Sequence, residues 1–272
     1  MTLEKVKLSK EKETLLITLY GKALESRTPD SLLKDRFAEA AVSRIDYDFS
    51  RLKVDGNLAA GLAIRASVLD RWTSDYLAKH PEAIVLYLGC GLDTRPWRID
   101  PPPGVDWYDV DYPEVIELRR KLYPARDRHH LVASSVTDPV WLAAIPNDRP
   151  VFVVAEGLTP YLTADSGVDL LSRLVQHFPN GGELVCDVYN RLGLKLLRLN
   201  PSFRATGAEV NWAIEEPHEL EDKVLGLLLI EDEPAYGPEH AARMNWLSGL
   251  FARLWGRIRP LRGVGRLLRY RF

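Results

Sequence analysis

The stretch that decides the fold is Ala83-Ile84-Val85-Leu86-Tyr87-Leu88, followed at once by Gly89-Cys90-Gly91. The first six residues are apolar and rich in β-formers, and a short apolar run between breakers is typical of a buried parallel strand. The two glycines allow the backbone to turn tightly and to approach a ligand closely. We therefore predict a strand over 83–88 whose carboxyl end faces a binding site.

Further strands and helices are predicted after this first strand. The strands cover 105–110, 130–134, 151–155 and 183–189, and the segments after the second and fourth have the apolar spacing of helices. Strands that alternate with helices predict a mainly parallel sheet with right-handed crossovers. The fold class is therefore α/β and Rossmann-like, with helices on both faces of the sheet. A late helix over 219–225 and a late strand over 227–231 are also expected.

The first eighty residues have a helical pattern. Asp30-Ser31 is expected to cap one helix, and Asp55 opens a longer one that runs to about Lys79, because Pro81 prevents its continuation. We predict a single domain over 1–272. It would comprise a helical N-terminal extension (1–80), a ligand-binding core (83–190) and a substrate-side segment with a basic tail (191–272).

The composition is that of an ordinary globular protein. Of 272 residues, 46% are hydrophobic and 27% charged, which excludes a disordered chain and a disulfide scaffold. No apolar stretch approaches the ~20 residues that span a bilayer, and the N-terminus lacks an apolar signal core. A cytoplasmic protein is expected. The two cysteines, Cys90 and Cys186, have no ligand cluster beside them, so no metal site is predicted.

The net charge of −2 hides a basic tail, since Glu239 is the last acidic residue and eight arginines follow it. The remainder is acidic, and no recognition motif is present, which opposes binding to nucleic acid. An amphipathic helix packed on the domain is the favoured interpretation, and peripheral contact with an anionic membrane is the alternative. Apolar residues at helical spacing support a helix: Trp246, Leu247, Leu250, Leu254 and Trp255.

Acidic residues follow several of the predicted strands, at the edge where open α/β sheets bind ligands. Asp111 follows the second strand, where an acid can accept hydrogen bonds from both ribose hydroxyls of a nucleoside. Glu156 follows the fourth strand and Asp187 lies near the end of the fifth. Thr94 stands where a dinucleotide fingerprint needs its third glycine, which argues against a nicotinamide enzyme. A nucleoside without phosphates fits better, and S-adenosylmethionine is the obvious candidate.

Three motifs in order now make a resemblance specific. Residues 87–98 (YLGCGLDTRPWR), 109–115 (DVDYPEV) and 155–162 (AEGLTPYL) resemble the glycine, ribose-acid and fourth-strand motifs of the leucine carboxyl methyltransferase and polyketide O-methyltransferase family. The resemblance covers roughly residues 14–190. It implies a class I methyltransferase fold with a seven-stranded sheet and S-adenosylmethionine as the cofactor.

The resemblance also implies roles for individual residues. Arg65 matches the arginine that pairs with the methionine carboxylate, a role that suits a guanidinium fork. Gly89 and Gly91 would pass under the methionyl part, Asp111 would hold the ribose, and Glu156 would lie near the methionine amino group. Two further residues are matched: Tyr161 lines the methyl-transfer site, and Lys22 lies where some members use a lysine.

One position departs from the family pattern. The family places an acid and a leucine after the third strand, facing the adenine amine, whereas this chain has Ser135-Val136. Serine can still accept a hydrogen bond and Val136 can pack on the ring. Alternatively, Asp138 takes this role after a small register shift.

The methyl acceptor is the least specified part. A carboxylate acceptor needs no base, whereas a hydroxyl acceptor is helped by one, for which Tyr161 and Asp187 are the candidates, with His177 more distant. Specificity is expected from the N-terminal helices and from the segment after Arg191. The favoured function is O-methylation of a small polyketide-like molecule. A protein C-terminal carboxyl methyltransferase and a non-catalytic binding module are the alternatives, and the oligomeric state is left open.

Overall fold

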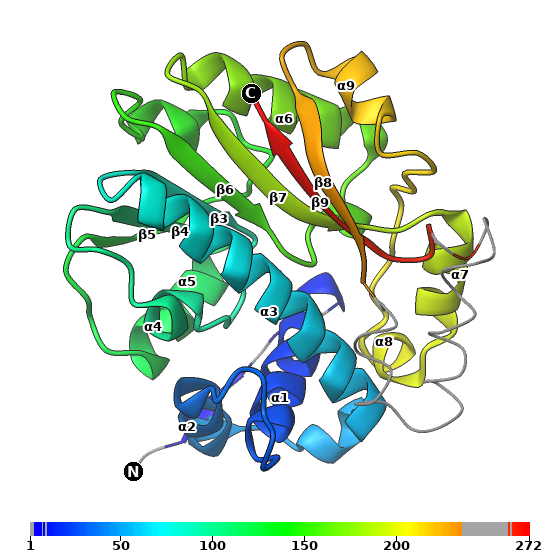
Figure 1. Cartoon of the computed structure of the whole chain (residues 1–272). Coiled ribbons are helices and arrows are strands. Elements are labelled where there is room, and N and C mark those ends of the chain that lie inside the picture. Colours follow the sequence, from blue (N-terminus) through cyan, green and yellow to red (C-terminus); the bar gives the residue numbers. More distant parts are fainter. Residues whose placement is uncertain (1–2, 7, 9, 236–260, 262) are drawn as a thin grey trace.

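The structure is a computed structural model that describes residues 3–6, 8, 10–235, 261 and 263–272 (Figure 1). Its centre is a seven-stranded sheet in the order β5-β4-β3-β6-β7-β9-β8. Neighbouring strands are parallel, except that β9 pairs antiparallel with both β7 and β8. The strands are β3 (Ile84–Leu88), β4 (Asp106–Asp111), β5 (His129–Ala133), β6 (Val151–Ala155), β7 (Gly182–Val188), β8 (Leu228–Pro234) and β9 (Arg266–Arg271).

Helices cover both faces of this sheet, and a short pair of parallel strands, β1 (Glu4–Lys5) and β2 (Ile45–Asp46), lies outside it. The mainly parallel α/β fold predicted from the sequence is confirmed. The α-helices are α1 (Thr14–Ser26), α2 (Arg36–Arg44), α3 (Gly56–Lys79), α4 (Arg95–Ile99), α5 (Pro113–Leu122), α6 (Ala164–His177), α7 (Arg191–Leu199), α8 (Pro201–Thr206) and α9 (Glu219–Lys223). The 3-10 helices are η1 (Lys10–Lys12), η2 (Phe49–Leu52), η3 (Val140–Ala144) and η4 (Thr159–Tyr161).

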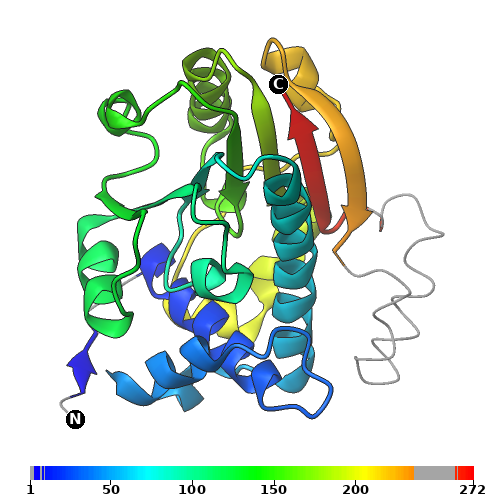
Figure 2. The same cartoon turned by 60° about the vertical axis from the view of Figure 1, so that its left-hand side comes forward.

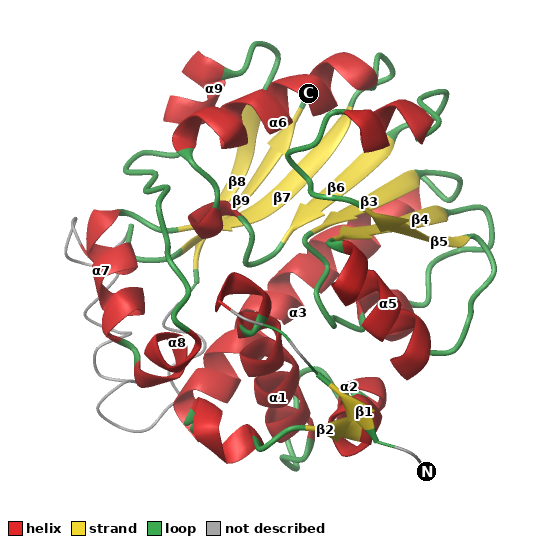
Figure 3. Ribbon diagram, turned by 180° about the vertical axis from the view of Figure 1, so that it is seen from behind, coloured by secondary structure: helices red, strands yellow, loops and turns green. Residues whose placement is uncertain are grey.

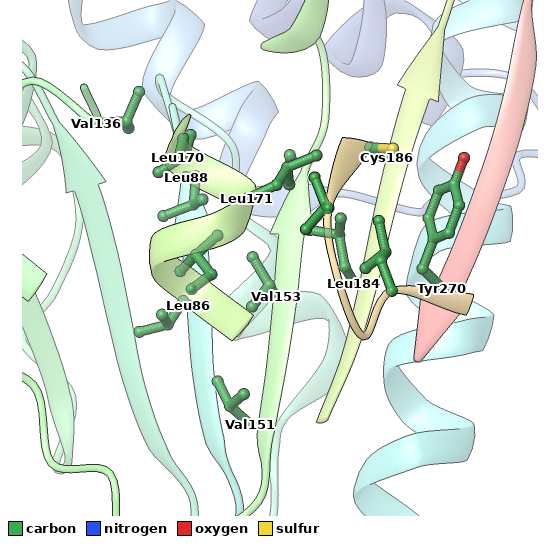
Figure 4. Packing of buried hydrophobic residues seen from close by; sticks show 14 of the residues in the cluster. Leu86, Leu88, Val136, Val151, Val153, Leu170, Leu171, Leu184, Cys186 and Tyr270 are labelled. Carbon is green, nitrogen blue, oxygen red and sulfur yellow. The ribbon is translucent and has the colours of Figure 1, made fainter. Parts of the chain in front are cut away.

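The central strand β3 is buried on both sides, which explains its uninterrupted apolar sequence. Ile84, Leu86 and Leu88 point to the face covered by α6, where Leu86 and Leu88 pack beside Leu170 and Leu171 (Figure 4). Val85 and Tyr87 point to the opposite face and join a cluster with α3. Side chains alternate along a strand, so the same short run supplies both layers of the core.

The long helix α3 begins and ends where the sequence predicts. The side chain of Asp55 accepts a hydrogen bond from the amide of Leu58 at 2.8 Å, and the helix ends at Lys79. The predicted start of α2 at Asp30-Ser31 is wrong. Asp35 caps this helix instead, accepting from Ala38 N at 2.9 Å. Lys34 has a left-handed φ of 47°, so a helix cannot continue through this residue.

Two helices after Arg191 were not predicted from the sequence. Asn190 caps α7 through Gly193 N at 2.8 Å, and Asn200 caps α8 through Ser202 N at 2.9 Å. Asparagine is a favoured N-cap residue, and Asn200 stands before a proline at the first helical position, which is a recognisable start signal. These caps were the local signal for both helices.

The basic tail needs a correction at its last residues. Arg266–Arg271 form β9, which inserts between β7 and β8 rather than lying on a surface helix (Figure 1). Arg269 is buried between Glu183 and Glu231, donating to each carboxylate at 2.6 Å. Acidic residues on the neighbouring strands therefore neutralise this arginine. The helical pattern predicted over 246–255 lies outside the described residues.

Helices α1 and α2 and the first part of α3 lie at one end of the sheet, beyond the carboxyl ends of its parallel strands (Figures 2 and 3). The rest of α3 packs on one face of the sheet. Leu16 and Leu19 of α1 are buried in a cluster that extends to Leu118 and Leu122 of α5, and Leu62 of α3 packs against it. This packing leaves a space between the helices and the strand ends, in which the site is found.

Gly167 gives a test of this packing. A Cβ built at Gly167 in α6 would lie 2.0 Å from Cζ3 of Trp212, which is itself buried. Glycine to alanine inside a helix ordinarily stabilises by up to about 1 kcal/mol. Here we expect Gly167→Ala to lower the free energy of unfolding by about 1–3 kcal/mol, because the ring must move.

The matched control for this test is Gly56→Ala, since nothing lies within 4 Å of a Cβ built at Gly56. It should leave the free energy of unfolding unchanged or slightly raised. Denaturant unfolding of both variants gives the comparison, and equal midpoints would contradict the packing of Trp212 on α6.

Candidate functional site

A cavity of about 990 Å³ lies between the carboxyl ends of the strands and the N-terminal helices. Its floor is made by the segments that follow β3, β4, β5, β6 and β7, and its walls come from α1, α3, α7 and α8. All nine cofactor and catalytic residues predicted from the sequence line it: Arg65, Gly89, Gly91, Asp111, Ser135, Val136, Glu156, Tyr161 and Asp187.

The glycine loop after β3 forms one side of the floor. Gly89 and Gly91 have φ values of +62° and +52°, a region that L side chains rarely adopt. A Cβ at Gly89 would lie 3.1 Å from Cδ1 of Leu158, and one at Gly91 would lie 3.2 Å from Cβ of Leu15. Glycine is therefore required by backbone conformation at both positions, and its absence of a side chain keeps the cavity open.

Asp111 ends the neighbouring strand β4 and meets this loop directly. Its Oδ2 accepts a hydrogen bond from Gly91 N, and its Oδ1 accepts one from Tyr112 N, both at 2.7 Å. Burial raises the pKa of Asp111 to about 6, although the two amide donors and Arg119 act in the opposite direction. The carboxylate is thus mostly ionised at neutral pH and still has lone pairs for hydroxyl donors.

The segment after β5 supplies the predicted adenine contacts. Ser135 and Val136 line the cavity, and Val136 is buried. The Ser135 hydroxyl lies 2.8 Å from the Thr137 hydroxyl, so its orientation is already held. Asp138 is exposed and caps the next turn by accepting from Val140 N at 2.9 Å. Since Asp138 is not among the lining residues, the structure favours Ser135 over the register-shifted alternative.

A buried cluster of charges lies beneath the cavity. Lys22 of α1 donates to Asp93 in the glycine loop, and to Oε1 of Glu156 after β6 at 2.8 Å. Arg95 of α4 donates to the other oxygen of Glu156 at 2.5 Å and, through Nε, to Asp70 of α3 at 2.6 Å. These contacts join three helices and two strand ends through charge-assisted hydrogen bonds.

The acids of this cluster remain ionised despite their burial. Burial alone would raise the pKa of Glu156, but Lys22, Arg95 and Arg65 outweigh it and lower the pKa to about 2. In the same way, burial alone would raise the pKa of Asp93, but Arg98 and Lys22 hold it well below its usual range. A rigid set of paired charges is the result.

Arg65 of α3 connects the cluster to β7. Its Nε donates to Glu156 at 3.2 Å and its Nη1 donates to Asp187 at 2.9 Å. Asp187 also accepts from Gly157 N at 2.5 Å, so both of its carboxylate oxygens are engaged. Arg65 is therefore ion-paired with two acids and lines the cavity.

Tyr161, in the short helix η4 after β6, also lines the cavity. Its hydroxyl is 3.1 Å from the hydroxyl of Thr14, and its ring stacks on Phe203 of α8 with 6.3 Å between the centroids. Burial raises the pKa of Tyr161, so the phenol keeps its proton at neutral pH. The aromatic pair forms a flat apolar surface near the N-terminal end of α1, where Thr14 lies.

The histidines were only partly placed by sequence. The strand predicted over 130–134 is β5, which begins at His129 and holds both His129 and the exposed His130. His129 has only 5% of its side chain exposed and hydrogen bonds to Asp109 at 2.7 Å. His177 bonds to the carbonyl of Ile145 at 2.9 Å, as expected for a structural residue. No histidine among the described residues lines the cavity.

Specificity was expected from the segment after Arg191, but some of its aromatic and polar residues do not line the cavity. Trp212 is buried against α6, and His218 is an exposed residue paired with Glu221 at 2.7 Å. Tyr236 lies outside the described residues. In the part of the chain that the structure describes, the substrate-side walls come instead from α7 and α8, through Leu196 and Phe203 among others.

Sequence reasoning missed most of the charged cluster. It noted Lys22 and Glu156 separately, but did not foresee that Arg95 and Asp93 would be buried with them, or that the half-buried Asp70 would pair with Arg95. A signal was available in the run Asp93-Thr94-Arg95, which directly follows an apolar strand and a glycine loop. Charged residues at such a place are close to the core, so their burial in ion pairs could have been expected. The partners come from distant helices, which a local pattern does not reveal.

S-adenosylmethionine fits the groups that line this cavity. The side-chain-free glycine loop admits a close backbone contact, Asp111 is an acceptor for hydroxyls, and Val136 is an apolar surface for a base. Arg65 supplies a guanidinium for a carboxylate, and Glu156 supplies a carboxylate for an ammonium. Each part of the molecule therefore meets a group of suitable chemistry.

The buried lysine makes a stability prediction. Lys22→Met would leave two buried carboxylates short of a cation, so we expect the free energy of unfolding to fall by about 3–5 kcal/mol. The control is Lys12→Met, which removes an ion pair to Glu114 whose side chains are 25% and 45% exposed, and which should cost less than about 1 kcal/mol. Equal losses in chemical denaturation would contradict this account of the cluster.

In the described part of the chain, every helix is too short or too polar to cross a membrane.

Comparison with known proteins gives a family model described as leucine carboxyl methyltransferase, which matches residues 16–175. Plantazolicin methyltransferase BamL, solved in complex with a triazolic desmethylPZN analog and SAH, has a similar structure with a TM-score of 0.52. It is 12% identical, and the match covers 96% of this chain and 98% of that one.

Two relatives are similar in sequence over almost the whole chain. The tetracenomycin polyketide synthesis O-methyltransferase TcmP of Streptomyces glaucescens is 41% identical over 269 residues, which cover 99% of both chains. The S-adenosyl-L-methionine-dependent methyltransferase dpfgK of Gibberella zeae is 34% identical over 276 residues, with 92% of this chain and 91% of that one covered. With the family model matching more than half of its length, this chain belongs to the leucine carboxyl methyltransferase family.

Proposed function

We propose that the protein is an S-adenosylmethionine-dependent O-methyltransferase that acts on a small, polyketide-like molecule. The observation that carries this proposal is the extent of the cavity. Its volume of about 990 Å³ is at the upper end of the 300–1,000 Å³ typical of small-molecule sites, so it has room for an acceptor beside the nucleoside. The relative named as a polyketide synthesis O-methyltransferase, 41% identical, supports the same function.

The acceptor end of the cavity is apolar and aromatic. Beyond the glycine loop, Leu58, Leu62, Leu197 and Phe203 line the walls, together with the ring of Tyr161. Such walls suit a flat, largely apolar molecule, because burying its faces gains free energy without unpaired polar groups. We assign α1, α3, α7 and α8 to acceptor recognition.

The cosubstrate binds along the strand ends in this proposal. Gly89 and Gly91 pass beneath its methionyl part, Asp111 accepts from the ribose hydroxyls, and Ser135 and Val136 contact the adenine. When bound, S-adenosylmethionine supplies an electrophilic methyl group on a sulfonium. The protein's contribution is to hold the acceptor oxygen in line, about 3 Å from that carbon, and to exclude water.

The methionyl end would lie against the charged cluster. Arg65 has its guanidinium at the cavity wall for the carboxylate, and Glu156 is held ionised by its cations, ready for the ammonium. Because both side chains are already fixed by ion pairs, little conformational freedom is lost when the cosubstrate binds.

The geometry favours an acceptor that is already an anion, and we propose a carboxylate over a hydroxyl. Of the two candidate bases, Asp187 has both oxygens engaged by Arg65 and Gly157, and Tyr161 retains its proton because burial raises its pKa. We therefore assign Tyr161 to acceptor positioning and Asp187 to the orientation of Arg65. A carboxylate is a competent nucleophile without proton transfer, so this site needs no base.

Labelled cosubstrate tests the acceptor class directly. The protein is incubated with methyl-labelled S-adenosylmethionine and an aromatic polyketide carboxylic acid, its preformed methyl ester with free phenols, or a peptide ending in leucine. Label on the acid alone supports the proposal, and label on the ester shows hydroxyl transfer. Label on the peptide would support the protein carboxyl methyltransferase suggested by the family model's description.

The remaining alternative, a binding module without catalysis, requires that no acceptor be labelled. We propose that the enzyme is cytoplasmic, because its cosubstrate is made in the cytoplasm. We also propose that it has no nucleic-acid partner. We also propose that residues 1–272 form one domain, since the cavity takes walls from the N-terminal helices and from α7 and α8 together.

The pKa of Asp111 gives a pH prediction. Below its pKa of about 6, Asp111 in the free protein holds a proton that a ribose-accepting carboxylate must release. Affinity for S-adenosylhomocysteine should therefore be nearly constant from about pH 7 upward and should fall below pH 6 by up to about tenfold per pH unit.

Calorimetric titration between pH 5 and 7 measures this effect, and Asp111→Asn is the control. The variant should bind weakly with no such pH dependence, since its amide does not titrate. A wild-type affinity that stays level from pH 7 to pH 5 would rule out Asp111 as the ribose acceptor.

A further inference from the structure

The outer side of the glycine loop is held by two side chains of the neighbouring helix. Arg119 in α5 donates from Nη1 to the carbonyl of Gly91 at 2.9 Å and to that of Asp93 at 2.8 Å. The hydroxyl of Tyr123, just after α5, donates to the carbonyl of Leu92 at 2.6 Å. Three successive carbonyls are thus bound by two residues spaced four apart, a spacing that places them on one helix face.

Neither of these side chains reaches the cavity. Gly91, Leu92 and Asp93 line it, whereas Arg119 and Tyr123 do not and are 1% and 7% exposed. The two side chains therefore hold the carbonyls from behind. Because the peptide group is planar, fixing a carbonyl also fixes the direction of the amide in the same peptide.

The loop's amides complete the arrangement. Gly91 N donates to Asp111, and Gly89 N donates to the carbonyl of Val110 at 2.9 Å. The loop is consequently held on one side by β4 and on the other by α5. Both glycines have positive φ. Because glycine adopts positive and negative φ about equally readily, these contacts select one of several backbone conformations.

The guanidinium of Arg119 is itself anchored to β4. Its Nη2 is ion-paired with Asp109, which also accepts from Trp107 Nε1 at 2.9 Å and contacts His129 at 2.7 Å. Burial would raise the pKa of Asp109, but Arg119 and the hydrogen bonds hold it below its usual value. Asp109 lies two residues before Asp111 in β4. The same strand therefore anchors Arg119, which holds the loop carbonyls, and carries the proposed ribose acceptor.

We propose that Arg119 and Tyr123 are positioning residues for S-adenosylmethionine, which keep the glycine loop in the shape that receives it. This inference rests on the proposed function, because it presumes that the loop binds this cosubstrate. The two residues act through the loop and touch no substrate. Loss of either contact should weaken cosubstrate binding by loosening the loop, with little effect on transfer once the site is saturated.

Tyr123→Phe is the sharpest test, because it removes one hydroxyl and leaves the ring. Its matched control is Tyr270→Phe, since the Tyr270 hydroxyl is also buried and donates to a backbone carbonyl, that of Pro217, at 2.9 Å. Both variants lose one buried hydrogen bond and should show a similar drop in Tm. Only Tyr123→Phe should weaken S-adenosylhomocysteine binding, by about 3- to 10-fold in calorimetry.

Two further measurements separate positioning from general destabilisation. Amide hydrogen exchange over residues 89–94 should be faster in unliganded Tyr123→Phe than in the wild type, and unchanged in Tyr270→Phe. Arg119→Lys keeps a charge but loses the planar fork whose Nη1 binds the two carbonyls while Nη2 pairs with Asp109. It should raise KM for S-adenosylmethionine while kcat stays within about twofold.

The outcomes distinguish this inference from the proposed function. If the wild type binds S-adenosylhomocysteine and Tyr123→Phe binds it equally well with unchanged loop exchange, the positioning role is overturned and the proposed function stands. Equal weakening in Tyr270→Phe would also overturn it. If the wild type itself does not bind, the proposed function fails and the inference fails with it.

Discussion

The charge of Lys22 must be neutralised where α1 meets the strand ends, and the site is arranged around that requirement. A buried ammonium is tolerable only beside ionised partners, here Asp93 from the glycine loop and Glu156 after β6. The N-terminal helices are thereby held at a fixed distance from the sheet. The cavity lies beside this contact, between the helices and the strand ends.

Two carboxylates at the ends of β4 and β6, the strands on either side of β3, show how differently burial can be compensated. Glu156 is surrounded by cations and its pKa falls to about 2, whereas Asp111 has mainly amide donors and its pKa rises to about 6. The first is held ionised by Lys22, Arg95 and Arg65 and joins the helices to the strand ends, while it also lines the cavity. The second accepts from two backbone amides and keeps lone pairs for the ribose hydroxyls of the proposed cosubstrate. Structural and binding roles are thus separated by the charge of the neighbours.

The sequence was informative wherever structure depends on local pattern. Strands β3 and β6 are short apolar runs ended by Gly89 and Glu156, and the residues after them were placed at the cavity correctly. Strand β9 was not predicted, because Arg269 makes it look solvent-exposed until Glu183 and Glu231 on other strands neutralise it. The charged cluster was missed for the same reason: its members are compensated by residues far away in the chain.

The insertion of β9 between β7 and β8 has a consequence for biosynthesis. The ribosome makes β8 well before β9, yet β8 joins the sheet only through β9. While translation proceeds, β8 has a free edge and the apolar residues Leu228 and Ile230, which invites wrong pairing. The acidic run Glu231-Asp232-Glu233 in the same strand repels a second copy of itself. Once β9 has formed, Glu231 and Asp232 pair with its arginines, so the charges that protect the nascent strand also stabilise the finished sheet.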